Sequence, residues 1–324
     1  MRTAVARVEA MRGRAAVPGL LPALAAVGVI VLAVFALTTD RFFTVDNVKA
    51  ILNSASIVGI MALGLTFVTL VGSLVSLAVG ATAVMGAMVF LDQLHLGLVP
   101  ALALAIAAGA AVTALQGAIV GGWGANPVIL TIGAGFLLSG VTSKLSDGVI
   151  VQPSAGGYTA LNSTPLGVPV GVYVMIVLAV VLQVLLRRTV FGRHVLLVGE
   201  NRDAARAAGI RITRTTALAF GIAGAAFAIG GAFLGAFNRG ASAQLEGTLT
   251  FDVIAAVLVG GTLISGGRGS PLRTLAGAVA IATISDVLLL RGFETGAQTL
   301  LKGVLVVGVV LALHLAGRGR EAES

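Results

Sequence analysis

The sequence predicts an all-α integral membrane protein with about ten transmembrane helices, some of them short or broken, and with both termini in the cytoplasm. Of its 324 residues, 57% are hydrophobic and only 10% are charged, whereas about 25% of the residues of a soluble domain are charged. The mean hydropathy is +1.05. Several apolar runs reach the roughly 18 residues that predict a membrane-spanning helix. Together these observations exclude a soluble protein.

The expected spans follow one another along most of the chain. They lie near residues 20–38, 55–72, 77–91, 98–121, 128–142, 168–186, 215–236, 251–265, 271–290 and 297–316. The first run is too long for the apolar core of a signal peptide, so an uncleaved span is favoured over a cleaved leader. Asp46 and Asn47 indicate a helix start before the second span. Several spans are short or interrupted by glycine, which fits helices that break inside the membrane around a path.

Glycine supplies 44 of the 324 residues, roughly twice its usual share of about 7%. In membrane proteins such an excess favours helices that pack closely through small residues. Two GxxxG motifs illustrate it, one from Gly117 to Gly121 and one from Gly231 to Gly235.

The charge distribution predicts the orientation. The net charge of +8 would suggest nucleic acid in a soluble chain, but the positive-inside rule explains it without a nucleic-acid partner. With the N-terminus inside, most arginines face the cytoplasm, and the outer loops hold Lys49, Lys144 and acidic residues that include Asp147 and Glu246. We therefore expect a multi-pass protein of the inner (cytoplasmic) membrane of a prokaryote, in contact with membrane lipid.

This arrangement divides the chain into three parts. Residues 1–19 form a cytoplasmic N-terminal segment, residues 20–316 a single transmembrane domain, and residues 317–324 a cytoplasmic tail. Within the domain, residues 143–167 form an outer loop rich in Ser, Gly, Pro and Thr, which predicts irregular or re-entrant structure. Residues 187–214 form an arginine-rich inner loop.

A short alanine-rich helix is expected in this inner loop, within Val198–Ile210. Asn201 can cap its N-terminus, Asp203 suits its first turn, and Gly209 can end it. A helix this short is marginal alone in water, so tertiary or partner contacts must hold it. Its alanines offer a smooth surface that another backbone can approach. An ordinary surface helix in an inner loop is the equally weighted alternative.

The residues that could support catalysis do not form a site. The chain has no cysteine, which excludes disulfides and thiolate metal sites. Its three histidines are too scattered for a metal cluster; they are His95, His194 and His314. The glycine-rich stretch from Gly266 to Ser270 lacks the Gly-Lys-Ser/Thr ending of a phosphate-binding loop. We therefore expect no metal, no catalytic residue and no ATPase site, and a tight inner turn at this stretch.

Few polar side chains fall inside the spans. Most serines and threonines there are expected to bond to their own helix or to a neighbour. Gln116, Asn126 and Thr131 are better candidates for a wet path, since amides are costly against lipid; a purely structural role is the alternative for each.

Three stretches resemble a known family, the ribose-type sugar ABC permeases, which belong to a larger group that includes branched-chain amino acid permeases. The first is Phe191–His194 followed by Gly199–Ile210, and the second is Phe251–Thr262 followed by Ser265–Ser270. The third is Asn126–Gly133, similar to the family's Asn-Pro-Phe-Ile-Val-Thr-Leu-Gly. They lie in the family's order, and the resemblance covers roughly residues 40–315.

The resemblance implies a transmembrane subunit of an ABC importer, built on the ABC importer permease fold. Two such subunits, identical or paired, would sit on two ATP-binding cassette subunits, which carry ATP and Mg, and would receive solute from an extracytoplasmic binding protein. The coupling residues that dock on the ATPase would be Gly199, Glu200, Asn201, Arg202, Asp203, Ala204, Ala205, Arg206 and Gly209. The inner turn would add partner contacts through Gly267, Arg268 and Gly269.

One departure from the family affects the expected path. The family usually has Gly-Gly-Ile-Asp-Leu-Ser-Val-Gly where this chain has Ser73–Gly80, so Ser76 occupies the acidic position. An intramembrane carboxylate is a functional-site candidate, and it is missing at this position. An altered path, or pairing with a different subunit that keeps the motif, would explain the change. The candidate path residues are Ser76, Gln116, Asn126, Pro127 and Thr131.

The function expected from all of this is import of a monosaccharide or related carbohydrate, by alternating access driven by a separate ATPase. An ABC permease for branched-chain amino acids or another small polar solute is the first alternative. An ion-coupled secondary transporter is the second, although the near absence of charge at the expected midplane counts against it.

Overall fold

The computed structural model describes residues 38–39, 42–304 and 307–308, which fall into two compact units. The larger unit is Thr44–Thr283, and the smaller one holds the described residues on either side of it. The expected N-terminal segment 1–19, nearly all of the span 20–38 and the tail 317–324 lie outside the described residues.

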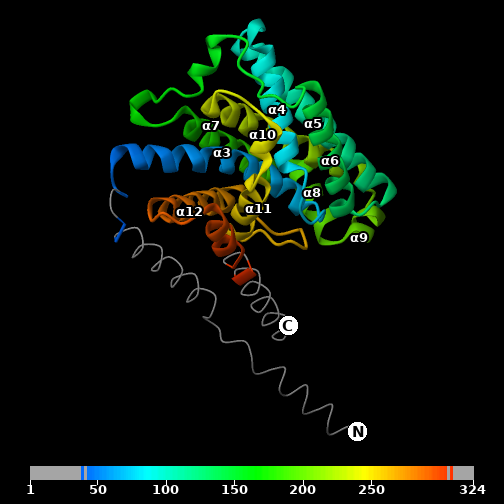
Figure 1. Ribbon diagram of the computed structural model, residues 1–324. Helices are drawn as coiled ribbons and strands as arrows, with labels where there is room; N and C mark the ends of the chain where they lie inside the picture. Colours follow the sequence, from blue (N-terminus) through cyan, green and yellow to red (C-terminus); the bar gives the residue numbers. More distant parts are fainter. Residues whose placement is uncertain (1–37, 40–41, 305–306, 309–324) are drawn as a thin grey trace. The chain divides into compact units, whose positions relative to one another are not determined.

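The described part of the chain is helical, and within it an isolated bridge between Val151 and Ala241 is the only strand-like pairing. Seven helices are long and apolar enough to cross a membrane. They are α3 (Val45–Leu70), α4 (Val79–Asp92, continued by η1, Gln93–Leu96), α5 (Leu98–Trp123), α6 (Pro127–Leu145), α7 (Val170–Arg188), α10 (Ile212–Asn238) and α12 (Pro271–Leu290) (Figure 1). The chain therefore folds as an integral membrane protein with an all-helical bundle, as the sequence predicted.

Shorter helices complete the chain between these spans. They are α8 (Val190–Glu200), α9 (Arg202–Ala207) and α11 (Leu249–Val259), with the 3-10 turns η2 (Gly156–Ala160), η3 (Pro165–Gly167) and η4 (Ala243–Glu246). Residues 143–145 of the expected outer loop belong to the end of α6. The rest of it is irregular apart from η2, η3 and the bridge at Val151. The expected span 251–265 was wrong. The helix in this region, α11, has only 11 residues and ends at Val259.

Helix α10 forms the centre of the larger unit, with α3, α4 and α5 packed around it (Figure 1). Most of the spanning windows of α3, α4 and α10 are buried, whereas only a small part of those of α5 and α6 is buried. The glycines determine how close the helices come. A Cβ on Gly117 would lie 2.7 Å from the Cβ of Phe220, and one on Gly231 would overlap the carbonyl of Ala83. The predicted close packing through GxxxG motifs is thus confirmed.

Candidate functional site

The alanine-rich helix of the inner loop is α9. The Oδ1 of Asn201 accepts hydrogen bonds from the N–H groups of Asp203 and Ala204, both at 3.0 Å, so Asn201 is the N-cap. Gly209 ends the helix with a φ of +79°, in the left-handed region that favours glycine. The N–H of Ile210 then bonds to the carbonyl of Ala205. Each of these local roles was predicted from the sequence.

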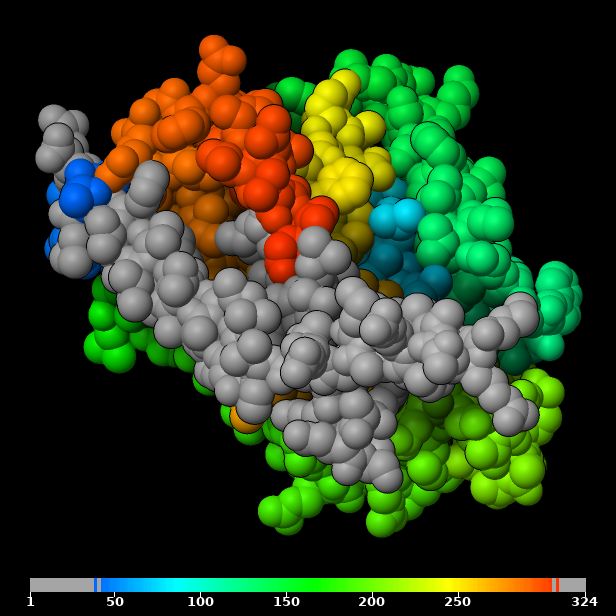
Figure 2. Space-filling view, turned by 90° about the horizontal axis from the view of Figure 1, so that it is seen from below, coloured from blue at the N-terminus to red at the C-terminus, as the bar shows by residue number. Residues whose placement is uncertain are grey.

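Most of α9 is open to solvent, and its yellow-green atoms are visible on the face shown in Figure 2. Asp203, Ala204, Arg206 and Ala207 are exposed. Ala205 is the exception, because it is only 4% exposed and packs inward. The smooth surface available to a partner therefore excludes Ala205, which the sequence reasoning had included.

Helix α8, which leads into α9, was not expected. Thr189 caps it by accepting a hydrogen bond at 3.1 Å from the N–H of Gly192. The threonine was the available signal, but the sequence reasoning ended the preceding span at residue 186 and expected a helix only within Val198–Ile210.

The end of α8, the end of α3 and the loop between α11 and α12 meet in what we call the inner junction, formed by Leu70, Gly72, Gly199, Gly266 and Gly267. The N–H of Gly267 donates to the carbonyl of Leu70 at 3.0 Å. A Cβ on Gly199 would overlap that carbonyl and would lie 2.6 Å from the nitrogen of Gly267. Gly72 and Gly266 have φ values of +75° and +90°. The three segments therefore touch through backbone atoms, with no side chain between them.

Arg202 extends this contact from α9 to the residue after Gly72. Its guanidinium donates to the Oγ of Ser73 at 3.2 Å. Burial lowers the pKa of Arg202, and the neighbouring charge of Arg206 lowers it further. A half-buried cation held by one hydroxyl fixes the position of α9 relative to the end of α3. Of the predicted coupling residues, Gly199 and Glu200 thus lie against Gly267, and Arg202 reaches Ser73. Arg268 is exposed.

Between α3 and α4 the chain is not helical, from Val71 to Ala78. The backbone here needs partners, since an unpaired N–H is costly inside a membrane. Hydroxyls provide them. The N–H of Leu77 donates to the Oγ1 of Thr131 on α6 at 3.1 Å, and that of Gly80 to the Oγ1 of Thr250 on α11 at 3.0 Å. Ser76 accepts from the N–H of Ala78 at 3.3 Å.

These groups lie within the bundle and away from its ends. Helix α10 has 27 residues and is about 40 Å long, so contacts along it show how far into the bundle the other helices begin and end. Gly64, near the end of α3, packs against Ala223, and Gly86, in the second turn of α4, packs against Ala228. Helix α4 therefore begins beside the middle of α10.

The carboxylate of Glu246 also lies at the start of α4. The Oγ of Ser139 donates to the Oε2 of Glu246 at 2.7 Å, and a Cβ on Gly80 would lie 2.7 Å from the Cγ of Glu246. We call Ser76, Leu77, Gly80, Thr131, Ser139, Glu246 and Thr250 the midpoint cluster. Sequence reasoning placed Glu246 in an outer loop because it expected a span at 251–265. It did not single out Ser139 or Thr250 as path residues.

The other predicted path residues lie elsewhere. Asn126 is the N-cap of α6, accepting from the N–H of Val128 at 2.9 Å, and Pro127 is the first residue of that helix. Gln116 is 5% exposed on α5, and neither polar atom of its side chain has a hydrogen-bond partner in the described residues. The structure thus joins Ser76 and Thr131 but not the other three.

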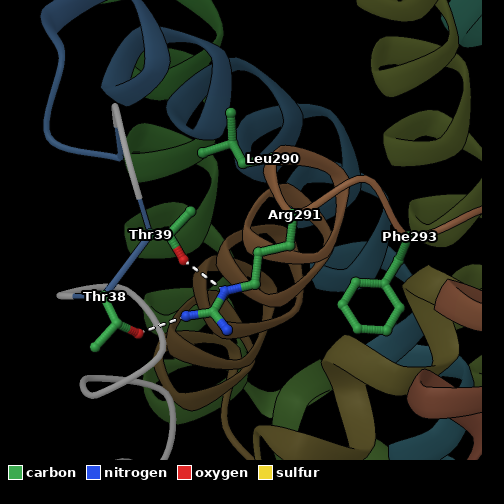
Figure 3. Close-up of a pocket in the computed structure, with 5 residues that line it drawn as sticks. All are labelled: Thr38, Thr39, Leu290, Arg291 and Phe293. Carbon is green, nitrogen blue, oxygen red and sulfur yellow. Dashed lines mark hydrogen bonds between the residues drawn. The ribbon is translucent and has the colours of Figure 1, made fainter.

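A shallow pocket occurs in the smaller unit, lined by Thr38, Thr39, Leu290, Arg291 and Phe293. The guanidinium of Arg291 donates to the hydroxyls of both threonines (Figure 3). None of the predicted site residues lines it.

Comparison with known proteins agrees with this architecture. The family described as "Branched-chain amino acid transport system / permease component" matches residues 47–312. The ribose import permease protein RbsC of Escherichia coli K12 is 30% identical over 290 residues, covering 87% of this chain and 90% of its own length. The probable ABC transporter permease protein YphD of the same strain is 34% identical, covering 86% of this chain and 85% of its own length.

A third relative is the autoinducer 2 import system permease protein LsrD of Yersinia enterocolitica, which is 29% identical over 304 residues and covers 91% of each chain. No solved structure matches the chain. The resemblance drawn from three short motifs therefore extends over most of the sequence, and the chain belongs to the family of permease components of the branched-chain amino acid transport system, as a membrane-spanning permease subunit of an ABC transporter.

Proposed function

We propose that this protein forms the translocation path of an ATP-driven importer for a monosaccharide or related carbohydrate. Its similarity to permeases named for ribose and autoinducer 2 import supports this solute class. The family's own description favours branched-chain amino acids as the second candidate.

The proposed assembly contains two permease subunits, two ATPase subunits that hold ATP and Mg, and an extracytoplasmic binding protein. This subunit would cross the inner membrane of a prokaryote ten times, with both termini and α9 in the cytoplasm. One of these crossings would be made by η4 and α11 together, since α11 alone has only 11 residues. The arginines of α7, α8 and α9 favour this orientation, because positive charge is retained on that side. The second permease subunit is either another copy or a partner that keeps the acidic residue replaced here by Ser76.

The observation that carries the mechanism is the inner junction. An ATPase that grips the exposed residues of α9 would pull on Arg202 and Gly199, which contact Ser73 and Leu70 directly. Ser73 is three residues from Ser76, in the non-helical stretch that ends at the midpoint cluster. Motion of α9 would therefore reach the path through one short piece of backbone. Interfaces of this kind switch between discrete arrangements because their packing does not deform continuously.

The test is uptake by proteoliposomes that contain the permease, its partner ATPase and its binding protein. With internal ATP, we expect accumulation of labelled D-ribose or another monosaccharide, and none of L-leucine. Accumulation of L-leucine alone would assign the protein to the amino acid branch. Uptake that persists without ATP and collapses with the ion gradient would overturn the importer proposal.

A further inference from the structure

Glu246 is an unusual residue for its position. It lies beside Gly80, the second residue of α4, and therefore next to the middle of α10. The position of α11, which follows Glu246 in the sequence, also places Glu246 near the middle of the bundle. The far end of α11 packs on the first turns of α12, where a Cβ on Gly260 would lie 2.6 Å from the Cα of Thr274. The 11 residues of α11 rise only about 16 Å from there. An ionisable side chain at such depth is costly and usually functional.

Its contacts leave half of the carboxylate available. Ser139 donates to Oε2, while Oε1 accepts no hydrogen bond from any described residue. Glu246 is only half-buried, and its Oε1 is not among the buried polar atoms that lack a partner. The free oxygen is therefore open to the surroundings. An accessible carboxylate oxygen within a membrane bundle indicates a water-filled space, because lipid would not solvate it.

The surrounding groups hold the charge in place. The absence of a side chain at Gly80 leaves room for the stem of Glu246, whose Cγ lies where a Cβ would crowd it. The stem of Glu246 lies beside the first turn of α4, where the positive end of the helix dipole favours a negative charge. The neighbouring hydroxyls of Thr131 and Thr250 are already used by backbone N–H groups. Glu246 is therefore the strongest free hydrogen-bond acceptor of the midpoint cluster.

We propose that Glu246 lines the translocation path and that its Oε1 accepts hydrogen bonds from the hydroxyl groups of a passing neutral, polyhydroxylated solute. Its carboxylate, on η4, would take the place of the acidic side chain that the family usually has before α4, where this chain has Ser76. Charge-assisted hydrogen bonds are strong, and one acceptor can be shared by successive hydroxyls as the solute moves. The solute class rests on the proposed function; the exposure of Glu246 to the path does not.

The first experiment tests exposure, using the natural absence of cysteine from the chain. Glu246→Cys is reacted, in the assembled transporter, with the membrane-impermeant reagent 2-sulfonatoethyl methanethiosulfonate, with and without ATP. Val257→Cys, on the following helix α11 and fully buried, is the matched negative control. We expect Cys at 246 to react at least about tenfold faster than at 257, and its rate to change between nucleotide states.

Equal, slow rates at the two positions would overturn the proposal. So would modification of Glu246→Cys by an uncharged, lipid-soluble maleimide alone, which would place the side chain against lipid. A rate that is fast but identical in every nucleotide state would also contradict it, because a path under alternating access cannot be open equally in all states. None of these readouts depends on which solute is carried.

The second experiment tests the role of the charge. Glu246→Gln keeps the length and a carbonyl acceptor for Ser139, so we expect normal assembly but an about tenfold lower uptake of the transported monosaccharide per ATP hydrolysed, the size expected for one charged hydrogen bond. Glu246→Asp should recover part of the loss. A purely structural role would lower the unfolding temperature of both variants and leave uptake per ATP unchanged, and that result would overturn the proposal.

Discussion

Replacing Gly199 by alanine tests the inner junction most directly. The new Cβ would overlap the carbonyl oxygen of Leu70 and lie 2.6 Å from the nitrogen of Gly267, whereas real Cβ atoms essentially never come within 3.0 Å of a neighbour. Both atoms belong to backbone, so no side chain can rotate away. The segments must separate, which breaks the hydrogen bond from Gly267 to Leu70.

The size of the effect follows from two costs. Overpacking a close contact by one methyl group costs about 1–3 kcal/mol, and a lost hydrogen bond adds roughly 1 kcal/mol. A local cost of about 2–4 kcal/mol is enough to shift the junction without unfolding the bundle, because α10 at the centre of the larger unit contributes no residue to it and only the end of α3 takes part. We therefore expect Gly199→Ala to assemble with its ATPase but to transport at most about a tenth as much solute per ATP hydrolysed.

The assay is simultaneous measurement of ATP hydrolysis and uptake in proteoliposomes. The matched control is Gly221→Ala on α10, where a Cβ would meet its nearest neighbour, the Cβ of Ala114, at an ordinary 3.4 Å; it should behave like the wild type. If Gly199→Ala keeps both the wild-type ratio of uptake to hydrolysis and the wild-type unfolding temperature, the junction does not couple the two processes.

Two alanines of α9 distinguish docking on the ATPase from packing within the protein. Ala204→Glu, at an exposed position, should abolish ATPase binding in a pull-down and leave the unfolding temperature unchanged. Ala205→Glu, at a buried position, should lower the unfolding temperature. Asn201→Ala removes the cap of α9 and should cost about 1 kcal/mol of local helix stability, seen as faster backbone amide exchange in α9 with unchanged exchange in α10. Thr131→Val leaves the N–H of Leu77 unpaired and should destabilise the protein by about 1–3 kcal/mol, whereas Thr131→Ser should restore most of this in thermal unfolding; equal loss in both variants would show that the hydroxyl is not what matters.

The positions of the full-length spans were largely predictable because each is an apolar run of membrane length. Helix α12 coincides with its expected bounds, and α6 starts at Pro127, directly after the Asn126 cap. Helix α3 starts at Val45, next to the helix start that Asp46 and Asn47 indicated. The expected span began about ten residues later because Lys49 and Asn53 lower the hydropathy of the first turns.

Depth in the membrane could not be predicted in the same way. Hydropathy averaged over a window cannot distinguish an apolar helix that runs the full length of the bundle from one, such as α11, that begins within it. Glu246 was therefore placed outside, and its contact with Gly80 joins residues 166 positions apart, which no local pattern records. The roles of Asn201 and Gly209 were predictable because capping depends only on neighbours in sequence.

The inner junction has a consequence for how this protein can change over time. Ordinary interfaces are adjusted by exchanging one side chain for another, a little larger or a little more polar. Where Gly199, Gly266 and Gly72 meet, there is nothing to exchange, since every alternative residue adds atoms to a space that is already filled. Substitutions can therefore accumulate on the exposed surface of α9 and along the solute path. At the glycines of the inner junction between them, a substitution would disrupt the contact.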